Sequence, residues 1–121
     1  MKIEIDVDFE AEVASFYQSL GITQGPGDVQ YRLILLVLAK NGEERITRFS
    51  EIRRYTDEFA DRGSIGSKMK TVFQLEGLVE RVERGGYRIT KKGMIAARFI
   101  QMTSEFYKKV KMTESLIERI P

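Results

Sequence analysis

The stretch of residues 94–120 constrains the fold most, because neither glycine nor proline interrupts it. As an α-helix it would be about 40 Å long at 1.5 Å per residue. A chain of 121 residues is too small to cover such a helix with one core, so we expect only its first half to pack on the domain itself. Apolar residues recur along it in steps of three and four, which is typical of a helix that pairs with another helix. We expect a dimer interface across a two-fold axis, formed by Phe99, Met102, Phe106, Val110, Ile117 and Ile120.

The alternative is that this helix folds back onto the N-terminal part of the chain. Residues 2–9 alternate apolar and charged side chains, which is the period of a half-buried strand with an acidic outer face. From Asp8, a candidate N-cap, apolar residues recur at helical spacing until Gly21. The Gly-Pro-Gly run at residues 25–27 then interrupts the chain. The sequence therefore predicts an N-terminal extension made of one strand and one helix.

The residue types present exclude most enzyme mechanisms. The chain has no Cys and no His, so zinc fingers, disulfides, thiol chemistry, imidazole bases and serine-histidine triads are excluded. We therefore expect neither an enzyme nor a metal or other cofactor. A hydrophobic fraction of 42% and a net charge of +2 indicate a soluble globular protein. The apolar run at residues 33–39 is too short to span a membrane, and residues 1–12 contain no apolar signal segment, so we expect a cytoplasmic location.

The middle of the chain predicts a buried helix followed by a short strand. Asp28 can cap a helix that runs to about Lys40 and is apolar on nearly every side, as a central buried helix is. Residues 45–47 are short and β-prone.

Two further helices follow, joined by a tight glycine turn at residues 61–63. The first covers about residues 49–60. The second covers residues 64–76, with a buried stripe of Ile65, Met69, Val72 and Phe73 and an outward face of Ser67, Lys68, Lys70, Thr71 and Gln74. Two helices joined in this way form a helix-turn-helix.

A β-hairpin is predicted around the adjacent glycines Gly85 and Gly86. Both central positions of a type I′ turn need a positive φ, which glycine adopts readily. This turn places Glu83 opposite Arg88 and Val82 opposite Ile89, so that one face holds an opposite-charge pair and the other an apolar pair.

Charge is divided unevenly along the chain. Residues 1–30 carry −5, residues 31–63 carry +1 and residues 64–121 carry +6. A basic C-terminal half favours a polyanionic partner. Solvated helix faces explain scattered charge equally well, so the placement of the charges has to decide.

The sequences RFSEIRR at residues 48–54 and LEGLVERVERGGYRITKKG at residues 75–93, with the amphipathic helix that follows them, resemble the microbial winged helix-turn-helix transcriptional regulators, including the PadR-like, HxlR-like and related archaeal groups. The resemblance covers roughly residues 28–120. It implies a mainly α fold with a small β-sheet, consisting of a winged helix-turn-helix domain at residues 27–93 and a dimerisation helix at residues 94–121. The strand-helix extension at residues 1–26 lies outside the resemblance and is predicted from its residue pattern alone.

The resemblance also implies sequence-specific binding of double-stranded DNA by a homodimeric transcriptional regulator. The second helix of such a motif enters the major groove, which implies base contacts from Ser64, Ser67, Lys68, Lys70, Thr71 and Gln74. The lysines could reach guanine or phosphate, Gln74 adenine and Thr71 the thymine methyl group. A basic wing tip lies on the backbone or in the minor groove, which implies Arg84, Gly85, Gly86 and Arg88. Further contacts to the DNA backbone are implied for Arg48, Arg53, Arg54, Lys91 and Lys92.

Two other functions stay open at the level of sequence. A winged helix can act as a protein-protein interaction module of the transcription or replication machinery, with the N-terminal strand adding to the sheet of a partner. It can also act as a DNA-binding adaptor in plasmid or chromosome segregation. Residues 63–68 do not have the residue order of a phosphate-binding loop, and the acids at residues 6–12 lack the glycine of a calcium loop, so neither site is predicted.

Overall fold

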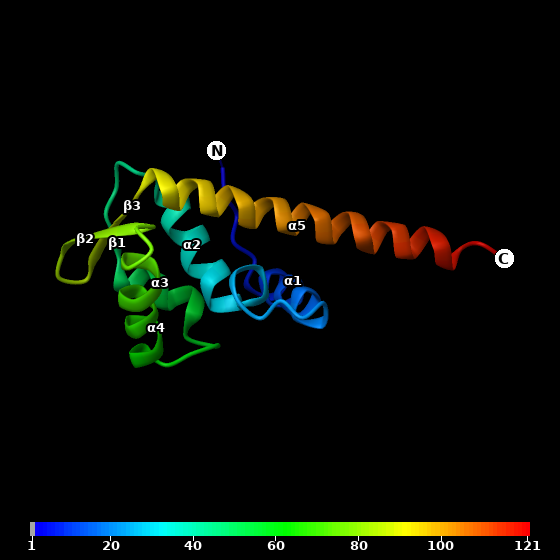
Figure 1. Ribbon diagram of the computed structural model, residues 1–121, viewed down its shortest axis with the longest axis horizontal. Helices are drawn as coiled ribbons and strands as arrows, with labels where there is room; N and C mark the ends of the chain where they lie inside the picture. Colours follow the sequence, from blue (N-terminus) through cyan, green and yellow to red (C-terminus); the bar gives the residue numbers. More distant parts are fainter. Residues whose placement is uncertain (1) are drawn as a thin grey trace.

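The computed structural model describes residues 2–121, and it is mainly helical (Figure 1). The helices are α1 (Val7–Ser19), α2 (Val29–Asn41), α3 (Phe49–Thr56), α4 (Arg62–Lys68) and α5 (Lys91–Glu118), with a short 3₁₀ turn, η1 (Gly25–Gly27), and a π-helical segment, η2 (Met69–Gln74). Three strands, β1 (Thr47–Arg48), β2 (Val79–Glu83) and β3 (Gly86–Ile89), form an antiparallel sheet in the order β1-β3-β2. The expected class, mainly α with a small β-sheet, is confirmed.

Helix α2 forms the centre of the core, as its apolar composition predicts. Residues 32–39 are all buried. The Asp28 carboxylate caps the helix by accepting the backbone N–H of Gln30 at 2.9 Å. Helices α1, α3 and α5 pack around α2, so the packing of these three helices is organised by one apolar segment.

The predicted N-terminal strand is not formed. Residues 2–6 are not part of the three-stranded sheet, and α1 begins at Val7. Asp6 caps this helix, with Oδ1 accepting the N–H of Phe9 at 3.1 Å, so the predicted cap at Asp8 is wrong. Ile3 is nevertheless buried in the main core. The alternation in this segment therefore reflects burial of one side of an extended segment, without the backbone pairing that defines a strand.

The β-hairpin is formed, but its register differs from the prediction. Val79 lies opposite Ile89, and Glu80 lies opposite Arg88, so the predicted partners Val82 and Glu83 are wrong. The turn is formed by residues 84 and 85, and a bulge between Arg81 and Glu83 in β2 precedes it.

The third strand explains this register. Gly86 pairs with Arg48 of β1, so it belongs to β3 and cannot serve in the turn. Of the two adjacent glycines, Gly85 has a positive φ, at 70°, and Gly86 does not. A bulge adds an unpaired residue to one strand and so shifts the pairing beyond it.

Helix α5 begins at Lys91, three residues earlier than predicted, because the Thr90 hydroxyl caps it by accepting the N–H of Gly93 at 3.0 Å. Its first part lies along α2, and its last part projects beyond the rest of the protein (Figure 1). The face that packs inward consists of Gly93, Ala97, Ile100, Thr103, Ser104 and Tyr107.

The apolar stripe predicted along α5 lies on a different face of the helix. Phe99, Met102 and Phe106 are 54%, 64% and 53% exposed. The first half of the helix therefore does pack on the domain, but with other residues than this stripe. The phase of the apolar residues cannot distinguish the two faces, since both repeat in steps of three and four.

Helix α1 packs against the middle of α5. The Tyr17 hydroxyl donates to the backbone carbonyl of Thr103 at 2.7 Å, and the Tyr107 hydroxyl donates to the Glu12 carboxylate. Burial raises the pKa of Tyr107 to about 12, and its bond to Glu12 adds to the increase. All residues from 111 to 121 are exposed. The expected alternative, in which the distal stripe folds back onto the N-terminal segment, is therefore wrong.

Candidate nucleic-acid interface

Helices α3 and α4 follow one another, and residues 57–61 connect them. Helix α3 ends at Thr56, earlier than predicted, and the chain turns because Arg53 Nη1 donates to the carbonyl of Ala60 at 2.7 Å. Asp61 then caps α4, with Oδ1 2.7 Å from the N–H of Ser64. Hydrogen bonding by Ser64 lowers the pKa of the Asp61 carboxyl, which therefore stays charged at the positive end of the helix.

The segment formed by α4 and η2 is anchored by three apolar side chains. Ile65, Met69 and Phe73 are fully buried, as predicted, and the Phe73 ring stacks on Tyr31 at 5.2 Å between centroids. This anchoring leaves the opposite side of the segment in solvent. Four of the six residues predicted to contact bases are exposed there: Ser64, Ser67, Lys70 and Thr71.

The other two predicted base-contacting residues are not exposed. Lys68 is half-buried, and its Nζ lies 2.5 Å from Oδ2 of Asp28, at the cap of α2. Gln74 is also half-buried. The prediction of an outward-facing Lys68 and Gln74 is therefore wrong: Lys68 is held by Asp28, and Gln74 lies in η2, where the larger number of residues per π-helical turn rotates the faces of the helix. The Lys68 contact joins residues 40 positions apart, so no local pattern could have indicated it.

The tip of the hairpin presents one arginine. Arg84 is exposed, whereas Gly86 is buried, with Arg48 and Ile46 against the position of a Cβ atom. Arg88 is half-buried, and its buried Nε has no hydrogen-bond partner among the described residues. The predicted wing contacts are thus reduced to Arg84, the backbone of Gly85 and the partly accessible guanidinium of Arg88.

The residues predicted to contact the DNA backbone differ in their exposure and in whether they already bind a partner within the protein. Arg54 and Lys91 are exposed. Arg48 is exposed but forms an ion pair with Glu83 at 3.0 Å. Arg53 points into the connection after α3, and Lys92 Nζ donates to the carbonyl of Glu76 at 2.6 Å. The last two therefore have structural partners.

Sequence reasoning missed Arg62, the first residue of α4. Its guanidinium lies over the ring of Phe49, 5.0 Å from the centroid, and the residue is exposed. The residue lies in Asp61-Arg62-Gly63, where the sequence pattern predicts only a turn.

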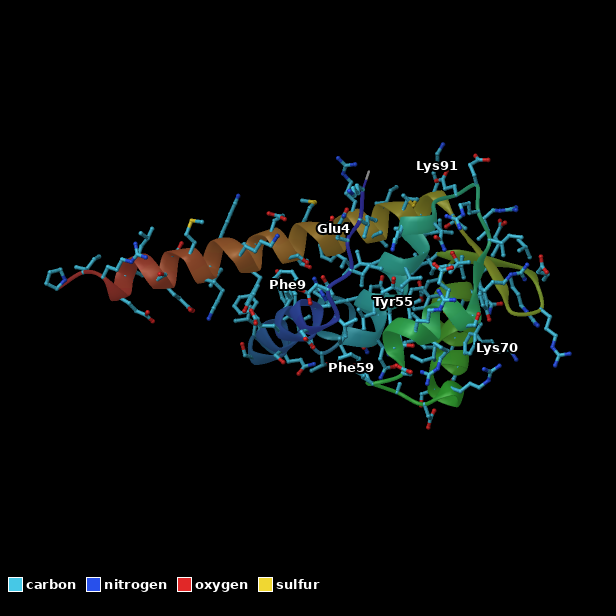
Figure 2. The ribbon with its side chains drawn as sticks, turned by 180° about the vertical axis from the view of Figure 1, so that it is seen from behind. Glu4, Phe9, Tyr55, Phe59, Lys70 and Lys91 are labelled. Carbon is cyan, nitrogen blue, oxygen red and sulfur yellow. The ribbon has the colours of Figure 1, made fainter. Side chains whose placement is uncertain are left out.

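Phe49 connects α4 to the hairpin. Its backbone N–H donates to the carbonyl of Gly85 at 2.9 Å, and its ring lies under Arg62. Figure 2 shows that Lys70 projects on the side of the molecule where the β2–β3 hairpin lies, whereas Lys91 lies at a separate edge, near the start of α5. We call this surface the α4–hairpin surface and define it by Arg62, Ser64, Ser67, Lys70, Thr71 and Arg84.

No cluster of three or more metal-ligating side chains occurs in residues 2–121. Over the same residues, no helix has the length and apolarity needed to cross a membrane. Comparisons with protein-family models, with curated proteins and with solved structures found no match for this chain.

Proposed function

We propose that this protein is a winged helix-turn-helix transcriptional regulator that binds double-stranded DNA as a dimer. The element order α2-β1-α3-α4-β2-β3 and the strand order β1-β3-β2 support this proposal. In this interpretation α4 with η2 is the recognition helix, and the β2–β3 hairpin is the wing.

The observation that carries the proposal is the contact of Phe49 with both parts. Its backbone bonds to the hairpin turn at Gly85, and its ring supports Arg62 at the start of α4. One residue thereby fixes the recognition helix relative to the wing. A DNA-binding domain needs a fixed position of the recognition helix relative to the wing, because contacts to the DNA backbone set the register in which the base contacts are made.

The exposed residues fit distinct roles on DNA. Lys70 would contact a phosphate at the edge of the major groove, and Ser67 beside it would read base edges. Arg84 would contact a phosphate strand or the minor groove. Arg62 and Arg54 would contact phosphates on either side of the recognition helix.

The dimeric part of the proposal is supported by the exposed stripe on α5. Its large apolar side chains, including Phe99 and Phe106, remain more than half exposed in one copy. An isolated domain seldom leaves such a continuous stripe in water. A two-fold dimer would place two recognition helices to meet half-sites about one helical turn apart.

The test is fluorescence anisotropy with a labelled random DNA duplex over a series of salt concentrations. We expect micromolar binding that weakens steeply with salt, since each neutralised phosphate releases counterions. A variant with Lys70→Ala and Arg84→Ala should lower the magnitude of the slope of log K against log salt by about 2, at about 0.9 per phosphate contact.

The matched control carries Lys2→Ala and Lys40→Ala. These exposed lysines line one shallow depression with Tyr55, and their loss changes the net charge by the same amount. The control should bind DNA with nearly the wild-type slope. Equal losses in the two variants would mean that binding depends only on net charge, and absence of binding by the folded wild type at low salt would contradict the proposal.

A further inference from the structure

The exposed stripe on α5 continues from the domain into the projecting end of the helix. Ile95 and Ile117 are 69% and 61% exposed and lie on the line of Phe99, Met102 and Phe106, and Ile120, just beyond the end of α5 at Glu118, is 70% exposed. At 1.5 Å per residue the stripe is about 37 Å long. It is therefore one continuous helical seam, of which only the first part lies beside the domain (Figure 1).

The spacing of the seam fits a second copy that runs in the opposite direction. In one antiparallel register Ile95 lies opposite Ile120, and Phe99 lies opposite Leu116, within one residue of Ile117. The same register places Met102 opposite Thr113. A single alignment thus matches the apolar positions from both ends, as antiparallel helix pairs require.

The charges beside the seam favour the same direction. In the antiparallel register Glu105 of one copy lies within one residue of Lys109 of the other, and two-fold symmetry repeats this pair. In an in-register parallel pair Lys109 would lie opposite Lys109, and Glu105 opposite Glu105. Like charges in these positions oppose pairing.

A groove beside the first part of the seam lies where the projecting end of the second copy would be. It is open, has a volume of about 910 Å³, and lies between the η2 region and the start of α5. Its apolar lining includes Tyr31, Val72, Leu78 and Phe99. In the antiparallel register the projecting Leu116, Ile117 and Ile120 reach this groove.

Pairing of the two α5 helices alone buries less area than a stable dimer needs, so the groove must contribute to the interface. A seam about 37 Å long and about 10 Å wide gives a few hundred Å² of contact. A typical stable interface buries about 800 Å² on each partner. Helix pairing alone falls short, and the groove beside η2 supplies further apolar surface.

We propose that two copies pair through α5 in an antiparallel register centred between Tyr107 and Lys108, and that the projecting end of each helix covers the groove of its partner. This deepens the dimeric part of the proposed function and rests on it. Its consequence is that the helical segment carrying Ser67 and Lys70 is supported from the other copy, because Thr71 and Val72 of the same segment line the groove.

Single-cysteine variants test the register, since the natural chain has no Cys. Ile95→Cys and Ile120→Cys replace exposed side chains, so neither should unfold the protein. Under mild oxidation we expect an equimolar mixture of the two variants to form a disulfide-linked dimer in high yield. Each variant alone should give at least about tenfold less, because its own cysteines lie tens of ångströms apart.

Two controls make each outcome decisive. A mixture of Phe99→Cys and Ile117→Cys should crosslink as the first pair does, and a mixture of Ile95→Cys and Phe106→Cys should not. Self-crosslinking of Ile95→Cys and of Ile120→Cys alone would overturn the proposal in favour of a parallel pair. Absence of crosslinking in both mixtures would also overturn it, whether sedimentation shows a monomer or a dimer. No DNA is present, so the result is independent of the anisotropy test.

Discussion

Arg32 and Glu10 form an ion pair in the protein interior, with Nε of the arginine 2.8 Å from Oε1 of the glutamate. Arg32 has no exposed surface and Glu10 only 5%. The guanidinium also donates to the hydroxyls of Thr103 and Ser104 and to the carbonyl of Pro26. One side chain of α2 thus binds α1, the η1 turn and α5 together.

Replacing Arg32 should therefore destabilise the protein strongly. We expect Arg32→Met to lower the free energy of unfolding by about 3–5 kcal/mol, because it leaves the Glu10 carboxylate buried without a partner. Urea unfolding at pH 7 measures the change. Arg81→Met, at an exposed position on β2, is the control and should stay within about 0.5 kcal/mol of wild type. The double replacement Arg32→Met with Glu10→Met should recover much of the loss, and no recovery would contradict the role assigned to the buried charge.

The pH dependence of stability should reveal Glu10. Burial raises the pKa of its carboxyl above the ordinary value, although Arg32 opposes this, and Asp6 and Lys108 add smaller effects of opposite sign. A raised pKa means that the folded state binds the proton more tightly than the unfolded state. Glu10 therefore contributes its full stabilisation at a pH below 4.5, the ordinary pKa of a glutamate. This stabilisation is lost as the pH rises through the pKa that Glu10 has in the folded state.

The measurement is the unfolding free energy of wild type minus that of Glu10→Gln between pH 4.5 and 7. We expect this difference to decrease with rising pH. An increase over the same range would show that the ion pair with Arg32, rather than burial, dominates the pKa of Glu10.

Gly93 should not tolerate a side chain. A Cβ at this position would lie 2.2 Å from the carbonyl oxygen of Leu78 and 2.6 Å from Cγ1 of Ile89, so α5 would have to move away from the sheet. We expect Gly93→Ala to destabilise by at least about 2 kcal/mol. Gly63→Ala is the control in α4, where the nearest atom is 3.6 Å away, and it should stabilise by up to about 1 kcal/mol. Thermal unfolding of both variants measures the change in melting temperature. Changes of the same sign in the two variants would contradict the prediction.

Lys68 and Lys70 should differ in their effect on DNA binding. Lys70 is exposed, whereas Lys68 is engaged by Asp28. We expect Lys70→Ala to reduce the salt dependence of binding by about one phosphate contact and Lys68→Ala to leave it nearly unchanged. Lys68→Ala should instead lower stability by less than about 1 kcal/mol, since its ion pair is partly exposed to solvent. Anisotropy and urea unfolding of the same two proteins measure both effects, and a larger loss of binding from Lys68→Ala would reverse the assignment.

Local patterns in the sequence determined most of the helices. The Asp28 cap, the apolar run of α2 and the buried positions Ile65, Met69 and Phe73 follow from helical periodicity and capping. These features depend on residues within a few positions of one another, so one chain segment contains all the information needed. The long α5 helix belongs to the same group, because neither glycine nor proline occurs in it after Gly93 in its first turn.

Contacts between distant residues decided the rest. The hairpin register depends on β1, which pairs with Gly86 from a position 38 residues earlier, and a two-strand argument cannot include that strand. The extended segment before α1 alternates apolar and charged residues as a strand does, but it pairs with no strand. Such alternation indicates which side of a segment is buried and does not indicate whether its backbone is hydrogen-bonded to another strand.

The candidate site divides in the same way. The sequence alone determined that a basic helix and a glycine-containing hairpin occur in this order, because composition and turn chemistry are local. Only the tertiary structure decided which side chains are free: it engages Lys68 with Asp28, buries Gly86, and brings Arg62 and the hairpin turn together at Phe49. The physical reason is that exposure and charge pairing depend on packing between segments far apart in the chain, which periodicity within one segment does not specify.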